Sequence, residues 1–512
     1  MIQANRCDTM TGAKRCCSAL SSGPLSSLVK NPRVIRATEI AFLAVLVVVG
    51  AGLRVYRSDT GLWYDEIVTL LDSVRPPLLR IVTHFPSNND HPLYSVIAHL
   101  SVSIFGTTPF ALRLPAVLFG VAAIPLLYFV GRAVTGRLEA GAAALILTFS
   151  YHHIWFSQNA RGYTALLFFV MLSTLALIRW FETGSRSSLV VYAVSTALGA
   201  YAHLTMVLVC LSHALAGVFD WLWYGRDSRV RAQRLEFASA FVGAGLLTIA
   251  LHLPMLLDVS AFYTPGATAR DQVATPLWSV LAALRGLQAG FGSVWVIVIG
   301  AVLFGAGVWS YFKQRPTVMV LMLLAVPFTL LVILVLQRPV RPRFVLFAIG
   351  FGLLVTLRGA ATLGASLVPR AQGWLSGRQA ATAMVVLLTV GALAVSIRSL
   401  PFGYRFPKQD FEAAVGFVEQ SKGTSHVAAV VGGTAAVPVL RYLGRAWPRI
   451  ERENQLDELR VNGGDVWVLY TFPSYIETGQ PDLWTALLKR CTAVREFVGT
   501  VEGGTVTVQR CR

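Results

Sequence analysis

The sequence predicts an all-α membrane protein that crosses the bilayer many times and ends in a small soluble α/β domain. Three observations support this fold class. Of the 512 residues, 55% are hydrophobic and only 14% are charged, whereas soluble proteins carry about 25% charged residues. Apolar stretches of roughly 20 residues, the length that crosses a bilayer, recur along the chain. After about residue 399 these stretches give way to short alternating segments.

Eleven stretches have the composition of membrane-spanning helices. They are 39–55, 112–131, 138–154, 163–179, 189–203, 206–223, 237–257, 293–312, 317–336, 344–366 and 381–397. The stretch 92–106 is apolar but covers only about 22 Å at a rise of about 1.5 Å per residue. We therefore expect it to lie at the membrane interface, within a long outer loop over 56–111.

Charge indicates the orientation. If 92–106 does not span, twelve basic residues between the predicted helices lie on the side of the N-terminus and six, counted after residue 131, lie on the opposite side. Cytoplasmic loops carry the excess of Lys and Arg. The sequence therefore predicts an inner (plasma) membrane protein with a cytoplasmic N-terminus and an extracytoplasmic C-terminal domain.

Three regions follow from this pattern: a basic cytoplasmic tail over 1–36, a membrane module over 37–398 and an α/β domain over 399–512. In the last region we expect strands at 426–431, 465–470, 493–499 and 504–509, and helices near 408–420, 435–443 and 481–490. Gly432 and Gly433 resemble a phosphate loop only faintly, and a tight turn is the better interpretation. Cys491 and Cys511 can pair if the domain is extracytoplasmic.

The net charge of +18 does not indicate nucleic-acid binding, because the chain has no basic amphipathic stripe and no nucleic-acid motif. Topology signals and contact with anionic lipid explain the basic residues. The six cysteines show no metal-binding spacing, and we expect neither a metal nor a cofactor.

Candidate site residues begin with an acidic pair just beyond the first span. The segment GLWYDE holds Trp63, Tyr64, Asp65 and Glu66, and acidic residues near lipid mark functional sites by default. The alternative is that Asp65 caps the helix that follows. Both interpretations can hold if Glu66 assists the cap while Asp65 faces a substrate.

Further polar residues fall on the same predicted outer face. His91 begins the interfacial helix and Arg113 lies at the mouth of the second span, although a plain helix start and an arginine that reaches the headgroups are the alternatives. The dense segment SYHHIWFSQNARGY contains Gln158, Arg161 and Tyr163. Aromatic anchoring explains its rings but not its histidines and QNAR. Its His-His pair has no third ligand at helical spacing, so zinc is disfavoured.

The basic outer loop QRPVRPRF, with Arg341 and Arg343, departs from the charge rule. A bound anion such as a lipid phosphate explains the departure, and anionic headgroups alone are the alternative. His203, between the fifth and sixth spans, is a weaker addition.

This set of residues suits attack by a hydroxyl on a sugar attached to a phosphate. Asp65 is the candidate base, and the candidates to bind the departing phosphate are Arg161, Arg341, Arg343, His91 and Arg113. The candidates to line the substrate pocket are Trp63, Tyr64, Gln158, Tyr163 and His203. A single displacement of this kind inverts the anomeric centre.

The segments WYDE, DHPLY, ALRLPA, SQNARGY and RPVRPRFVLF, in this order, resemble those of GT-C fold membrane glycosyltransferases of the protein-O-mannosyltransferase and aminoarabinose-transferase type (families 39 and 83). The resemblance implies a polyprenyl-phosphate sugar donor, metal-independent inverting transfer, and interfacial helices in the first outer loop. It also implies that Asp65 is the base, that Glu66 supports it, and that Arg113 and Arg161 serve the site. Leu93 departs from the HPP motif of the mannosyltransferases, so the acceptor stays open among lipid, glycan and protein.

Two other functions compete with this one. A transporter or lipid-linked-sugar flippase also carries polar residues in its membrane region, but here those residues crowd one face and no inverted repeat is visible. A non-catalytic scaffold does not require the acidic pair.

Overall fold

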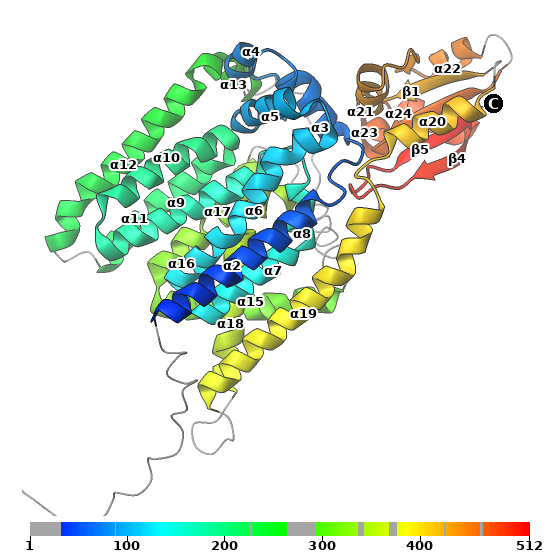
Figure 1. Ribbon diagram of the computed structural model, residues 1–512. Helices are drawn as coiled ribbons and strands as arrows, with labels where there is room; N and C mark the ends of the chain where they lie inside the picture. The colour runs from blue at the N-terminus through cyan, green and yellow to red at the C-terminus, as the bar shows by residue number, and fades with distance from the viewer. Residues whose placement is uncertain are drawn as a thin grey trace, which may run out of the picture.

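The structure is a computed structural model. It describes residues 32–87, 89–224, 228–263, 293–335, 342–367, 376–423, 426–460 and 464–511. A bundle of long helices forms one body, and a small α/β domain lies beyond one end of the bundle, reached through the long helix α19 (Figure 1).

The helices of the bundle follow the predicted apolar stretches. In chain order they are α2 (Pro32–Val55), α6 (Pro109–Val134), α7 (Arg137–Phe149), α8 (Tyr151–Ser157), α9 (Tyr163–Thr183), α10 (Arg186–Ala202), α11 (Thr205–Tyr224), α12 (Ser228–His252), α13 (Leu256–Tyr263), α15 (Val294–Gln314), α16 (Pro316–Leu323), α17 (Ala325–Val335), η3 (Pro342–Ala348), α18 (Ile349–Ser366) and α19 (Gly377–Arg405). The core of the bundle gathers around α9, whose residues Leu167, Met171 and Leu177 are fully buried. Large apolar side chains that face outward, such as Val48 and Leu257, suit a lipid environment.

The predicted count of eleven spans is not confirmed. Within the described ranges, nine helices are long and apolar enough to cross a membrane. The predicted spans 138–154 and 189–203 correspond to α7 and α10, which have 13 and 17 residues. The last helix, α19, continues to Arg405, beyond the predicted boundary at 399.

The predicted span 138–154 is interrupted at Ser150, where α7 ends and α8 begins. Arg54, a fully buried residue in the last turn of α2, contacts this break. Its guanidinium donates to the carbonyls of Leu147 and Thr148, both at 3.2 Å, and lies 2.6 Å from Nδ1 of His153. The Leu147 carbonyl also accepts the backbone N–H of Ser150 at 3.4 Å. Carbonyls at the end of a helix need partners from outside it, and Arg54 supplies them at this break.

The first outer loop contains four short helical segments: α3 (Tyr64–Val68), η1 (Thr69–Val74), α4 (Leu78–Thr83) and α5 (Pro92–Phe105). Helix α5 has 14 residues, which corresponds to about 21 Å and does not cross a bilayer. Its length agrees with the prediction that 92–106 lies at the interface.

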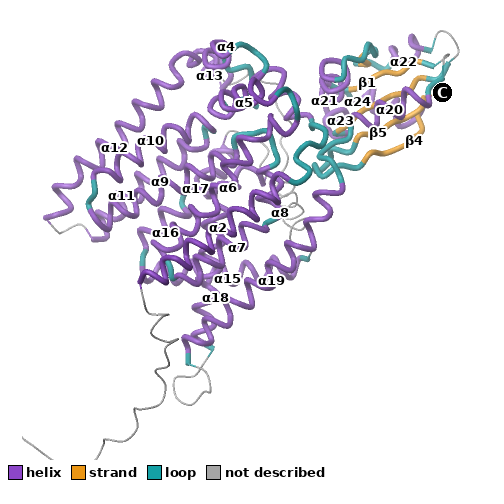
Figure 2. The backbone as a smooth tube through the Cα atoms, viewed as in Figure 1, coloured by secondary structure: helices purple, strands orange, loops and turns teal. Residues whose placement is uncertain are grey.

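The α/β domain is built on a five-stranded sheet with the order β2-β1-β3-β5-β4. The strands are β1 (Val427–Val431), β2 (Arg449–Ile450), β3 (Val466–Thr471), β4 (Cys491–Phe497) and β5 (Val506–Cys511), and Figure 2 shows them as the strand region of the molecule. The helices around them are α20 (Phe411–Ser421), α21 (Gly433–Ala436), η4 (Val437–Tyr442), α22 (Asn454–Leu459), α23 (Pro473–Gly479) and α24 (Pro481–Arg490). The four predicted strands lie within two residues of β1, β3, β4 and β5, while β2, α22 and α23 were not predicted.

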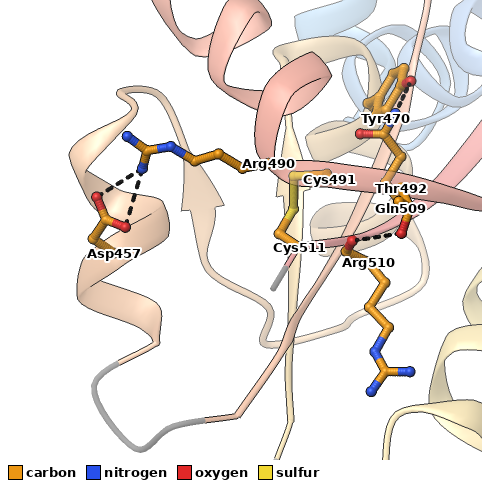
Figure 3. The surroundings of a disulfide bond; sticks show 8 residues. All are labelled: Asp457, Tyr470, Arg490, Cys491, Thr492, Gln509, Arg510 and Cys511. Carbon is orange, nitrogen blue, oxygen red and sulfur yellow. Dashed lines mark hydrogen bonds and ion pairs between the residues drawn. A yellow bond between two sulfur atoms is a disulfide. The ribbon is translucent and has the colours of Figure 1, made fainter.

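The predicted pairing of two cysteines is present in the structure. Cys491 and Cys511 face one another across β4 and β5 and form a disulfide (Figure 3). Gly432 has φ +77°, a left-handed conformation that favours glycine. It therefore forms the expected tight turn at the end of β1.

One face of the sheet shares a core with the first outer loop. Ile67 and Leu70 of that loop pack in the same buried cluster as Val415 and Val418 of α20 and Val430 of β1. The α/β domain is thus seated on the segment that carries the acidic pair.

Candidate functional site

An acidic side chain and two arginines from distant parts of the chain meet above the bundle. Asp65 lies in the first turn of α3, Arg161 in the turn before α9, and Arg343 in η3. Oδ2 of Asp65 is 2.5 Å from Arg161 and 3.2 Å from Arg343. The Asp65 side chain is 14% exposed and that of Arg343 is 29% exposed, so a ligand from solvent can reach this ion pair.

Arg161 also fixes the ring of His91. Its Nε donates to Nε2 of His91 at 3.0 Å. Because Nε2 accepts this bond, Nδ1 carries the proton and donates to the carbonyl of Ala202 at 3.1 Å. Burial, and then the positive charge of Arg161, lower the pKa of His91 well below its ordinary value. His91 is therefore a neutral hydrogen-bond partner that orients Arg161.

Two aromatic side chains, Tyr163 and His203, pack beside the ring of His91. The rings of Tyr163 and His203 lie 5.6 and 5.0 Å from the ring of His91, and the Arg161 guanidinium lies 5.4 Å from the Tyr163 ring. Burial, together with the nearby Arg161 and Arg343, lowers the pKa of His203 to about 3. The positive charge at this site therefore comes from arginine and not from histidine.

Glu66 points away from Asp65 and His91 into a fully buried cluster. The Arg113 guanidinium donates to its two carboxylate oxygens at 2.8 and 2.5 Å, and the backbone N–H of Ala160 donates at 2.8 Å. Burial favours the neutral acid, but Arg113 and Lys408 outweigh it and hold the pKa of Glu66 below its ordinary value. Arg113, predicted at the phosphate, is fully buried beneath the site.

The remaining predicted residues line or support the segment around Asp65. Trp63 donates through Nε1 to Asn159 at 3.2 Å. Gln158 donates to the carbonyls of Arg54 and Tyr56, at 3.1 and 2.8 Å, and so ties the end of α2 to the site. Tyr64 keeps its side chain partly exposed beside Asp65, where burial and the neighbouring carboxylate raise its pKa. Arg341 lies outside the described residues.

Sequence reasoning missed two site residues in the connector between α19 and α20. Lys408 is buried 3.8 Å from Glu66, and burial followed by the charge of Arg113 lowers its pKa to about 7. Gln409 accepts a hydrogen bond from the backbone N–H of Tyr64 at 2.9 Å. Neither residue lies in an apolar or motif-like pattern, so no local signal marks them.

A third missed contact comes from the first outer loop itself. Asn89 donates to the backbone carbonyl of Asp65 at 2.9 Å and to Thr69 at 3.2 Å. Asn89 follows residue 88, which lies outside the described residues. The side-chain amide of Asn89 fixes the turn that presents Asp65.

The arrangement has the chemistry of an anion site next to a proton acceptor. Two guanidinium groups favour a phosphate, and a carboxylate between them is suited to accept a proton. Among the described residues, no group of three or more His, Cys, Asp or Glu side chains is placed to hold a metal ion.

A family model matches part of the chain, and several solved structures are similar to most of it. The family "Dolichyl-phosphate-mannose-protein mannosyltransferase" matches residues 89–256. ArnT from Cupriavidus metallidurans is 12% identical with a TM-score of 0.50, covering 93% of this chain and 98% of its own. The oligosaccharyltransferase AglB from Archaeoglobus fulgidus, in complex with an inhibitory peptide and a dolichol-phosphate, is 11% identical with a TM-score of 0.55, covering 91% of this chain and 74% of its own. No curated protein sequence matches.

The structural matches show the fold. The family match covers a stretch that includes His91, Arg113 and Arg161. Together they confirm the predicted class: the chain is similar to the protein-mannosyltransferase family and is a glycosyltransferase with the GT-C fold.

Proposed function

We propose that the chain transfers a sugar from a polyprenyl-phosphate donor to a hydroxyl of an envelope lipid, glycan or protein on the outer face of the membrane. The observation that carries this proposal is the contact of Asp65 with both Arg161 and Arg343. A carboxylate and two guanidinium groups at one point supply a base for the acceptor and a cationic seat for the donor phosphate.

The reaction is a single displacement. The acceptor oxygen forms a bond to the anomeric carbon while the bond between that carbon and the phosphate oxygen breaks. Asp65 takes the hydroxyl proton, and the polyprenyl phosphate leaves with the bonding electron pair and an added negative charge. Arg161 and Arg343 stabilise this charge, and attack opposite the leaving group inverts the anomeric centre.

The other residues have supporting roles in this proposal. His91 orients Arg161, and Tyr163, His203 and Tyr64 line the sugar pocket. Glu66 and Arg113 hold the segment that presents Asp65 and do not contact the phosphate, because both are fully buried. This assignment replaces the phosphate-binding role predicted for Arg113.

The orientation belongs to the same proposal. The excess of basic residues on the side of the N-terminus supports a cytoplasmic location for that end. The disulfide between Cys491 and Cys511 favours an oxidising, extracytoplasmic location for the α/β domain. A reporter fused after residue 230 should read cytoplasmic, and one fused after residue 450 should read outside. Two reporters on the same side contradict this topology.

The activity test uses membranes that contain the full chain and a labelled polyprenyl-phosphate sugar. Asp65→Asn should lower transfer by roughly 10²–10⁴-fold, the usual contribution of a general base, with unchanged protein abundance. Asp457→Asn is the control, because Asp457 pairs with Arg490 at the surface of the α/β domain, away from the first outer loop. Unchanged transfer by the Asp65 variant removes this residue from the mechanism. Mass analysis of envelope glycans and lipids in cells that lack the protein identifies the acceptor.

A further inference from the structure

We infer that Lys408 and Gln409 are positioning residues through which the α/β domain holds the Trp63–Glu66 segment in its active geometry. The inference rests on the proposed function and extends it, because it makes the α/β domain a part of the catalytic unit. Both residues lie in the connector between α19 and α20, more than 300 residues from the segment that they hold.

Lys408 holds the Glu66 side of the acidic pair. Its ammonium lies 3.8 Å from Oε1 of Glu66, donates to the carbonyl of Gln158, and lies 5.4 Å from the ring centre of Trp155. The Lys408 side chain is only 7% exposed, so these contacts take the place of hydration by water. A buried ammonium requires such partners, which ties the connector to both Glu66 and the segment before Arg161.

Gln409 holds the other side of Asp65. Its Oε1 accepts a hydrogen bond from the backbone N–H of Tyr64 at 2.9 Å. Its Nε2 donates to Oγ1 of Thr471 and to the carbonyl of Gly504, both at 3.0 Å. The amide is therefore fixed by the α/β domain at one end and fixes the residue before Asp65 at the other.

The hairpin between β4 and β5 clamps the connector. Backbone N–H groups of Thr500 and Val501 donate to the carbonyls of Pro407 and Lys408 at 2.9 and 3.2 Å. A Cβ on Gly499 would overlap the Lys408 carbonyl. The Thr500 hydroxyl also accepts from Nε1 of Trp155 at 2.9 Å. The position of Lys408 thus depends on the folded α/β domain and not on the membrane helix alone.

These contacts bear on catalysis because Asp65 lies between the two residues that are held. A displacement of about 1 Å at a reacting group costs up to 10²-fold in rate. A change at Lys408 or Gln409 should therefore lower the turnover number more than it changes the KM for the donor, since neither residue contacts Arg161 or Arg343.

The charge of Lys408 predicts that the transfer rate depends on pH. The charged groups that face it are Glu66 on α3 and Arg113 on α6, and Arg57 and Tyr404 line the same small cavity. Protonated Lys408 attracts Glu66, and this attraction is lost as pH rises through about 7, the lowered pKa of the ammonium. An arginine at this position stays charged at all pH values of interest.

The experiment measures transfer from a labelled polyprenyl-phosphate sugar by the full chain between pH 6.5 and 9, with envelope extract from cells lacking the protein as acceptor. Lys408→Met and Gln409→Ala should each lower the turnover number about tenfold or more, with the donor KM within about twofold. Lys408→Arg should restore most of the activity and remove the fall in rate above pH 7. Lys422→Met is the matched control, because Lys422 pairs with Glu419 within the same domain.

The outcomes separate this inference from the proposed function. If Asp65→Asn abolishes transfer while Lys408→Met and Gln409→Ala keep wild-type rates and pH dependence, the positioning role is wrong and the proposed function stands. If the wild-type protein transfers no sugar, the proposed function itself fails. Gly499→Ala, which displaces Lys408 without touching the site, should reproduce the loss in turnover, and a wild-type rate for this variant also overturns the inference.

Discussion

Both carboxylate oxygens of Glu66 accept hydrogen bonds from the guanidinium of Arg113, and neither side chain is exposed to solvent. Arg113 also donates to the carbonyls of Ser58 and Thr60 at 2.8 and 2.7 Å. The pair therefore joins the segment after α2, the start of α3 and helix α6 at one buried point. The geometry explains why an acidic residue next to Asp65 is needed even though it does not face the site.

Glu66→Gln should lower the free energy of unfolding by roughly 3–5 kcal/mol, because it leaves Arg113 and Lys408 buried without a countercharge. The thermal unfolding midpoint of the purified protein in detergent measures the loss. Glu182→Gln is the control, since the Glu182 side chain is 46% exposed in a surface ion pair. Equal midpoints for the two variants would contradict the buried cluster.

Gly162→Ala should displace the ring of His91 and so disturb the site. A Cβ at Gly162 would overlap the carbonyl of Ala202 and lie 3.1 Å from His91, so the ring that orients Arg161 has to shift. We expect at least about tenfold slower transfer, in line with the cost of small displacements at a reacting centre. Gly305→Ala in α15 has open space around it and should be neutral or slightly stabilising, because alanine favours a helix. A normal rate for Gly162→Ala would show that the contact is not needed.

Arg343→Gln should weaken binding of the donor phosphate by about 10–100-fold, the loss of one hydrogen bond to a charged group. Quenching of tryptophan fluorescence by added undecaprenyl phosphate reports the affinity. Arg186→Gln removes an arginine that is 84% exposed and paired with Glu236 on another part of the chain, and it should bind normally. If both variants bind alike, Arg343 does not contact the phosphate.

Removal of the disulfide by Cys491→Ser with Cys511→Ser should destabilise the α/β domain. The bond closes a segment with a sequence separation of 20 residues, for which loss of chain entropy in the unfolded state contributes about 3 kcal/mol. A reducing agent should lower the unfolding midpoint of the wild-type protein and leave that of the double variant unchanged. Cys210→Ser, which alters the free cysteine of α11, is the control. A wild-type protein that is insensitive to reduction would show that the bond does not form.

The membrane fold and much of the α/β domain follow from patterns that repeat locally. Apolar stretches marked the long helices, and short alternating segments marked β1, β3, β4 and β5. The break between α7 and α8 could not be predicted this way, because side-chain contacts at it come from Arg54, which lies about 100 residues earlier in the chain. An arginine at the end of a span has the same local pattern as one that only marks topology.

The site residues divide in the same way, into those that a local sequence pattern marks and those that depend on distant partners. Asp65, His91, Arg161 and Arg343 were selected as polar residues on one predicted face, and the structure brings them into contact. Lys408 and Gln409 were missed because their partners come from the other end of the chain. A single lysine in a polar connector has no local pattern that distinguishes a buried partner from a solvated side chain.

The contact of Asp65 with Arg161 and Arg343 has a consequence for the sequence of events in each catalytic cycle. Under the proposed function, a donor phosphate that binds the two guanidinium groups replaces the carboxylate as their counterion. Until that exchange occurs, the oxygen that takes the proton is occupied. Proton abstraction from the acceptor then follows binding of the lipid-linked sugar. This order keeps the Asp65 carboxylate paired with arginine in the substrate-free enzyme, and binding of the sugar donor makes the carboxylate available.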